Sequence, residues 1–208
     1  MDTALILREA MLLNGIMTNS EVWYIVKEEH IKTLESADNE LLRKVFNAHS
    51  KTAIELFFIE TAKIPVRFIL SKRRLLYLWT ILRHNENELI QKAYNAQQVV
   101  QTKGDWFLML NNERKKYGIE LSDKEIAKMS KYRFKALVNK KVNIFAANYL
   151  KQKASTHDKS LRILNGIKDN SVMRMLNKYD CQLLFKLRSM MLDVKSNFSN
   201  LYQNNFFM

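Results

Sequence analysis

The sequence has few residues that favour tight turns, with four glycines and one proline among 208 residues. β-Sandwiches, doubly wound α/β sheets and barrels use more of both residues in their connections. The abundant residues are Leu, Lys, Ala, Met, Asn and Glu, and most of them favour helices. The composition therefore predicts an all-α protein, built as an irregular array of helices with no extended sheet.

Cysteine is also scarce, since Cys181 stands alone. A single thiol excludes an intrachain disulfide and a Cys-rich zinc site, so we expect an intracellular protein, nuclear or cytoplasmic. We expect Cys181 to be a small core residue. No apolar run reaches the ~20 residues that span a bilayer, and Arg8 and Glu9 interrupt the apolar N-terminal segment. No secretory signal pattern is visible, and no membrane partner is expected.

The residue patterns of catalytic sites are missing from the sequence. No glycine-rich phosphate loop and no adjacent aspartates occur, and the histidines lack the spacing of metal ligands. We therefore expect no catalytic residue, no metal, no cofactor and no small-molecule substrate. The histidines, expected to be surface or loop residues, are His30, His49, His84 and His157.

Positive charge is concentrated in the later part of the chain. The net charge is +13, but residues 1–60 hold 6 Lys and Arg against 10 Asp and Glu, which gives −4. The remaining residues hold 28 basic and 11 acidic side chains, which gives +17. A surplus confined to one part of a chain indicates a polyanionic partner, and we expect the backbone of RNA or DNA.

Apolar periodicity and capping signals predict the helices. Ser, Thr or Asn followed three residues later by Glu suggests helix starts at Thr52, Asn85 and Ser122. We expect a linker near 154–160 and two helical regions, 1–100 and 101–208. The expected helices are 2–15, 28–47, 53–64, 65–83, 85–98, 106–117 and 131–153, with two more near 160–178 and 180–200.

Two of these helices carry the candidate phosphate contacts. Arg67 and Arg74 are seven residues apart and share a helix face. The alternative for these two arginines is structural: they could pair with the acidic helix expected at 28–47, for instance with Glu35 or Glu40. For the other basic residues the alternative is a solvated helix face. Trp23, Trp79 and Trp106 could stack on bases, although core packing is the more frequent role. The candidate nucleic-acid-binding residues are Arg67, Lys72, Arg73, Arg74, Lys140 and Lys141.

Several stretches, taken in order, resemble the region that follows the polymerase palm in reverse transcriptases of non-LTR (LINE-type) retrotransposons. In that family an apolar helix, a turn and Glu-x-Trp open the thumb, and Glu21 and Trp23 match the last part of this pattern. An Ile-Pro-x-Arg helix follows, here Ile64, Pro65 and Arg67. The matching stretches are LREAMLLNGIMTNSEVWY (7–24), ESADNELLRKVFNAHSKTAIELFFIE (35–60), IPVRFILSKRRLLYLWTILR (64–83), KGDW (103–106) and LLFKLRSMML (183–192).

The resemblance implies a truncated thumb-like region, 1–100, and a basic region after the thumb, 101–208. Such regions contact the backbone of RNA or DNA and other parts of a retroelement polyprotein. The palm with its metal-binding aspartates is absent, so no polymerase activity is expected from this chain by itself. Two alternatives remain open: a helical protein–protein module with an acidic partner, or a decayed open reading frame with no selected function.

Overall fold

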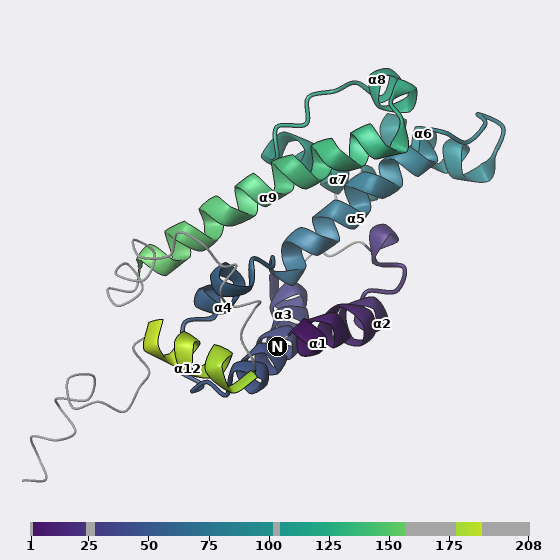
Figure 1. The fold of residues 1–208 in the computed structure, drawn as a ribbon. Coiled ribbons are helices and arrows are strands. Elements are labelled where there is room, and N and C mark those ends of the chain that lie inside the picture. The colour runs from purple at the N-terminus through teal and green to yellow at the C-terminus, as the bar shows by residue number, and fades with distance from the viewer. Residues whose placement is uncertain (1, 24–27, 102–104, 157–177, 189–208) are drawn as a thin grey trace, which may run out of the picture. The chain divides into compact units, whose positions relative to one another are not determined.

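The computed structural model describes residues 2–23, 28–101, 105–156 and 178–188 (Figure 1). Of the described residues 78% are helical, and none of them forms a strand. The expectation of an all-α protein is confirmed. The helices expected near 160–178 fall outside the described residues, and so do positions 189–200 of the last expected helix. The linker expected at 154–160 is described only at its start, where Ala154 and Ser155 still belong to a helix that ends at Ser155.

The helices of the described residues follow the expected order. The first expected helix is one helical run, in which the middle segment η1 is π-helical. The elements are α1 (Asp2–Leu7), η1 (Arg8–Leu13), α2 (Asn14–Ile16), the 3₁₀ turn η2 (Ser20–Val22), α3 (Glu28–Phe46), α4 (Ile54–Thr61), α5 (Val66–Ile81), α6 (Leu89–Val100), α7 (Trp106–Lys116), α8 (Asp123–Lys128), α9 (Lys131–Ser155) and α12 (Lys178–Arg188).

One of the three expected capping boxes forms completely. At the start of α8, the Glu125 amide donates to Ser122 Oγ at 3.3 Å, and the Ser122 amide donates to Glu125 Oε2 at 2.7 Å. The other two expectations are wrong about where the helix starts. Ala53 is the N-cap of α4. Glu88 is itself the N-cap of α6, because Asn85 and Glu88 close a separate turn in which the Glu88 amide donates to the Asn85 carbonyl at 2.9 Å.

The chain forms two compact units that are discontinuous in sequence. Unit 1 comprises residues 1–10, 37–63 and 149–208, and unit 2 comprises residues 11–36 and 64–148. The boundary expected near residue 100 therefore falls inside unit 2.

Unit 1 is built around an aromatic cluster. The rings of Phe46, Phe57 and Phe185 lie with centroids 4.5–5.4 Å apart and are fully buried. Burying each ring contributes ~1.5–3 kcal/mol to folding. Cys181, also fully buried, fulfils its expected role as a core residue. The three rings belong to a larger hydrophobic cluster, whose buried residues are Leu5, Leu42, Phe46, Leu56, Phe57, Phe58, Leu150 and Phe185.

Unit 1 also buries an ion pair. Arg8, in the π-helical segment, and Asp38, in α3, each have only 1% of the side chain exposed. Arg8 Nε and Nη2 donate to the two Asp38 carboxylate oxygens at 2.5 and 2.6 Å. The guanidinium also lies 5.8 Å from the ring centroid of Phe58. The buried charge of Arg8 is tolerated because the Asp38 carboxylate compensates it through two hydrogen bonds.

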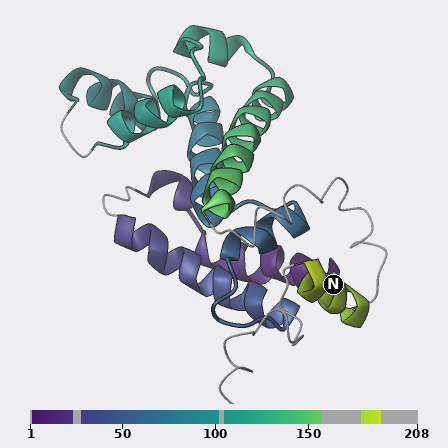
Figure 2. The same ribbon diagram turned by 90° about the vertical axis from the view of Figure 1, so that its left-hand side faces the viewer.

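Unit 2 places α5 against α9. The two helices run side by side in both views (Figure 1, Figure 2). The Phe68 and Phe145 ring centroids are 6.2 Å apart, and near the other end of the contact Trp79 Nε1 donates to the Met129 carbonyl at 2.9 Å. These contacts make α5 and the first part of α9 antiparallel. They also give Trp79 the packing role expected of it.

Candidate nucleic-acid interface

The two arginines expected on one face of α5 do share a face, and that face meets glutamates. Arg67 donates to both carboxylate oxygens of Glu35, with Nε 2.8 Å from Oε1 and Nη2 2.7 Å from Oε2. The same Nη2 lies 2.7 Å from Glu28 Oε1. Arg74 Nη1 donates to Glu113 Oε1 on α7 at 2.6 Å. Pairing with the acidic helix α3 is therefore observed for Arg67, whereas Arg74 pairs with a glutamate of α7.

A hydroxyl pair completes this contact between α5 and α7. Ser71, one turn after Arg67, donates to Glu113 Oε1 at 2.9 Å, and the Tyr117 hydroxyl donates to Ser71 Oγ at 3.0 Å. Burial raises the pKa of Tyr117 to about 12. The α5 face of Arg67, Ser71 and Arg74 is thus a polar contact inside unit 2.

The other two candidates on α5 also bind protein groups. Arg73 Nη1 donates to the Met17 carbonyl at 2.5 Å, and Nη2 donates to Asn14 Oδ1 at 2.9 Å. Lys72 Nζ donates to Asn143 Oδ1 on α9 at 2.8 Å, and burial lowers the pKa of Lys72. All four basic residues of α5 therefore donate hydrogen bonds to other parts of unit 2, although Lys72 and Arg73 are only half-buried and bond to uncharged groups.

Helix α9, like α5, carries basic and no acidic residues, but its basic side chains are more exposed than those of α5. It carries seven Lys and Arg residues and no acidic residue. All seven basic side chains are exposed. Its buried residues recur every fourth position and pack inward as one narrow row, with half-buried residues such as Phe145 beside it and exposed residues on the remaining surface. That buried row is Phe134, Val138, Val142, Ala146, Leu150 and Ala154.

Five of these basic residues lie in the part of α9 that belongs to unit 2, and we call them the α9 cations. Lys140 and Lys141 were expected as contacts, whereas the other three were not. In the described part of the chain, none of the five forms an ion pair with a carboxylate. They are Lys131, Arg133, Lys135, Lys140 and Lys141.

An aromatic group lies beside the start of α9. Arg83 Cζ is 5.6 Å and Lys131 Nζ is 5.9 Å from the ring centroid of Trp79. Each cation–π contact contributes ~0.5–1 kcal/mol at an exposed site. Tyr132, the next residue of α9, has 81% of its surface exposed. The start of α9 therefore combines positive charge with exposed aromatic surface.

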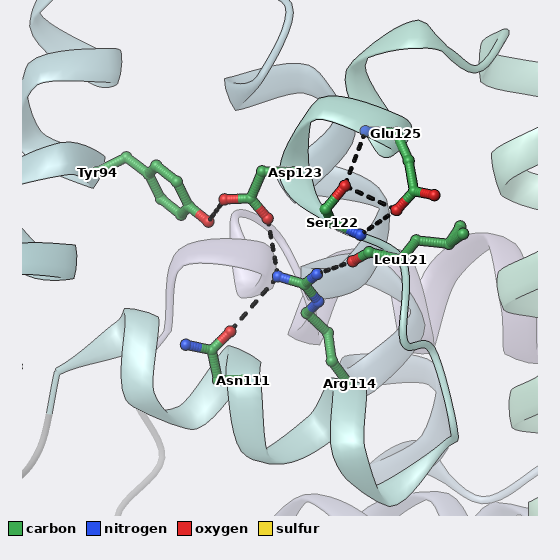
Figure 3. A network of polar contacts seen from close by, with 7 residues as sticks. All are labelled: Tyr94, Asn111, Arg114, Leu121, Ser122, Asp123 and Glu125. Atoms are coloured by element: carbon green, nitrogen blue, oxygen red, sulfur yellow. Dashed lines mark hydrogen bonds and ion pairs between the residues drawn. The ribbon is translucent and has the colours of Figure 1, made fainter.

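A polar network fixes the segment that leads into α9 (Figure 3). Arg114 of α7 donates through Nη1 to Asp123 Oδ1 at 2.8 Å and through Nη2 to the Leu121 carbonyl. The Tyr94 hydroxyl donates to Asp123 Oδ2 at 2.7 Å. Burial, and then the hydrogen bond to Asp123, raise the pKa of Tyr94 well above its usual value. This network holds α6, α7 and α8 together just before the chain enters α9.

The ammonium group of Lys116 lies over aromatic rings of unit 2. Its ammonium lies 5.2–5.9 Å from the ring centroids of Phe68, Tyr117 and Phe145. Burial is the largest influence on this lysine and lowers its pKa. Lys116 is exposed, as the α9 cations are, but its ammonium lies over aromatic rings of unit 2.

The described residues were also compared with the requirements of a metal site and of a membrane-spanning helix. Among the described residues, no three His, Cys, Asp or Glu side chains lie together in a way that could hold a metal ion. None of the helices in the described ranges is long and apolar enough to cross a membrane.

Comparisons with known proteins give no match. No protein-family model, no curated protein and no solved structure matches the chain. The resemblance to non-LTR reverse transcriptases therefore remains an expectation that rests on the sequence motifs alone.

Proposed function

We propose that the chain binds the phosphate backbone of RNA or DNA without sequence preference, through the α9 cations of unit 2. The observation that carries the proposal is a helix with seven exposed basic residues and no acidic residue. Exposed lysine and arginine side chains are the usual means by which proteins neutralise phosphates. In this proposal the chain performs no chemistry of its own.

The proposed phosphate contacts lie on α9 and not on α5. Arg67 and Arg74 are assigned to the stability of unit 2, because both form ion pairs with glutamates. Lys140 and Lys141 remain as phosphate contacts and are joined by Lys131, Arg133 and Lys135. Binding through a backbone agrees with what the resemblance to a thumb and post-thumb region implies.

A salt series on the unmodified chain tests the proposal. Five phosphate contacts to a single strand would lower the affinity about a hundredfold between 50 and 200 mM salt, because bound counterions are released. Filter binding with oligonucleotides of unrelated sequence measures this. Equal affinities for the sequences and a steep salt dependence are expected. A flat salt dependence would rule the proposal out.

Charge reversal localises the contacts. The double variant Lys140→Glu, Lys141→Glu should weaken binding to all sequences alike and flatten the salt slope by about one unit per lost contact. The matched control is Lys51→Glu, Lys92→Glu, which changes the net charge equally at two exposed lysines on other segments. The control should bind nearly as the unmodified chain does. Equal losses in both variants would mean that only overall charge matters.

A second candidate, a protein–protein module, is favoured by one observation on α6. Three apolar side chains of this helix are exposed: Leu89 by 83%, Val99 by 84% and Val100 by 65%. Exposed apolar residues gathered on one helix can mark a surface for a partner protein. The triple variant to Ser at these positions should leave nucleic-acid binding unchanged if α9 is the interface. A loss of nucleic-acid binding in that variant would indicate that α6, and not α9, forms the interface.

A further inference from the structure

We infer that the strand bound along α9 is single stranded, and that Tyr132 stacks on one of its unpaired bases. This inference rests on the proposed function and adds the class of nucleic acid and a base-contacting residue. The surface consists of Tyr132 with the neighbouring cations Lys131, Arg133 and Lys135. We refer to these four residues as the Tyr132 surface.

Tyr132 is placed for a ligand and takes no part in the core. It has 81% of its surface exposed, whereas the buried row of α9 begins at Phe134, which is fully buried. Within the described residues, its ring and hydroxyl make no ring contact or hydrogen bond. On a helix, position 132 falls on the side opposite the row of Phe134 and Val138. The aromatic face is therefore available to a ligand.

The neighbours of Tyr132 suit a nucleotide. Lys131 and Arg133 flank it in sequence, and Lys135 follows three residues later, about 4.5 Å along the helix axis. All three are exposed. A base could stack on the ring while the phosphates on either side contact these cations, which is how sequence-independent single-strand sites are built. The absence of acidic side chains from α9 gives the surface the charge opposite to that of the strand.

The aromatic ring favours an unpaired strand over a duplex. In a duplex each base face is already stacked on its neighbours, and extracting one base costs a few kcal/mol. A single strand offers its base faces at much lower cost. Cations alone would suit both forms, so Tyr132 is the residue that distinguishes them.

The chain contains a matched control for Tyr132. Tyr179, on α12 of unit 1, is exposed to nearly the same extent, 79%. Its neighbour Asp180 is acidic, so it lacks the continuous positive charge that surrounds Tyr132. Tyr179→Ala therefore removes an equally exposed ring without affecting the Tyr132 surface.

The experiment compares four proteins on three probes. The proteins are the unmodified chain, Tyr132→Ala, Tyr132→Phe and Tyr179→Ala. The probes are a single-stranded oligonucleotide, the same length of strand with every base removed, and the corresponding duplex. Single-stranded RNA and DNA are tested separately, and binding is followed by fluorescence anisotropy at one fixed salt concentration.

Tyr132→Ala should weaken binding to the single strand roughly 5- to 150-fold, the effect of losing one stacked base. Tyr132→Phe and Tyr179→Ala should bind as the unmodified chain does. Binding of Tyr132→Ala to the baseless strand and to the duplex should be unchanged. A loss with RNA or with DNA supports the inference and identifies the strand.

Two results would overturn the inference. The first is a Tyr132→Ala variant that binds the single strand normally while the unmodified chain shows salt-dependent binding to all probes, in which case the proposed function stands. The second is an equal loss on all three probes, which would assign Tyr132 to backbone contact or to folding. If the unmodified chain binds none of the probes, the proposed function fails as well.

Discussion

The guanidinium of Arg67 and the carboxylate of Glu35 form a two-point ion pair, with their nitrogen and oxygen atoms 2.7 and 2.8 Å apart. The residues are 32 positions apart in the sequence and lie on different helices. A planar guanidinium fits a carboxylate in this way better than any lysine could. The pair therefore accounts for an arginine at position 67 without any ligand. The exposed cations of α9 remain as the candidate phosphate contacts.

Arg74 should contribute to stability and leave nucleic-acid binding unchanged. Replacing one partner of a buried pair leaves the other charge uncompensated, so Arg74→Ala should lower the free energy of unfolding by about 3–5 kcal/mol. Urea unfolding followed by circular dichroism measures this. The exposed residue Arg133 is the control, since Arg133→Ala should change stability by less than about 0.5 kcal/mol. A normally stable Arg74→Ala protein would contradict the prediction.

The pair of Arg8 and Asp38 should be costly to break and easier to replace. Asp38→Ala should lower the free energy of unfolding by about 3–5 kcal/mol, because Arg8 stays buried and charged. The double variant Arg8→Met, Asp38→Leu removes both charges and should be more stable than Asp38→Ala. Thermal unfolding of the three proteins gives the comparison. A double variant less stable than Asp38→Ala would show that the ion pair itself is needed.

Two glycines should respond to alanine in opposite directions. Gly118, just after α7, has φ of +63°, a conformation that costs an L-residue ~1–2 kcal/mol. Gly118→Ala should therefore be destabilising. Gly15 lies in α2, and a Cβ there would meet no atom within 4 Å. Gly15→Ala should raise the free energy of unfolding by up to about 1 kcal/mol, and thermal unfolding shows the sign of each change.

Stability should fall at alkaline pH because of two buried tyrosines. Burial raises the pKa of Tyr94, and it raises that of Tyr117 to about 12. Above pH ~10 the unfolded chain loses these protons while the folded chain keeps them. Their contribution is therefore fully present below pH ~10 and is lost as pH rises through the folded pKa values.

The double variant Tyr94→Phe, Tyr117→Phe isolates this effect. Lys72 and Lys116, whose pKa values burial lowers, contribute with the opposite sign but are present in both proteins. Urea unfolding at several pH values between 9 and about 11.5 should give a shallower decline for the variant than for the unmodified chain. Parallel declines would show that the tyrosines titrate alike in both states.

Much of the helix pattern could be predicted from the sequence because its signals are local. The 3.6-residue periodicity predicted α3 and α9 to within two residues at each end. Capping signals were less informative, since the box at Ser122 formed whereas the patterns at Thr52 and Asn85 did not start helices. Ser, Thr and Asn side chains can also hydrogen-bond the backbone of a separate turn, so the pattern alone does not fix the first residue of a helix.

The roles of individual cations were harder to predict because ion-pair partners lie far away in sequence. Nothing near Arg74 indicates that Glu113, 39 residues later, will neutralise it. The sequence did not indicate Lys131, Arg133 and Lys135 as phosphate contacts, because they alternate with apolar residues. The basic residues at 72–74, in contrast, form an uninterrupted run. Counting charge over each expected helix would have added α9 to α5, since both helices carry several basic residues and no acidic one.

The discontinuity of unit 1 has a consequence for synthesis on the ribosome. Its aromatic cluster joins Leu5 to Phe185, which is translated 180 residues later. At ~5–20 residues per second, Leu5 waits about 10–40 s for that partner. The residues of unit 2, in contrast, are all translated by position 148. Unit 2 can therefore complete its core first, while the opening helix of the nascent chain keeps apolar surface exposed until α12 emerges.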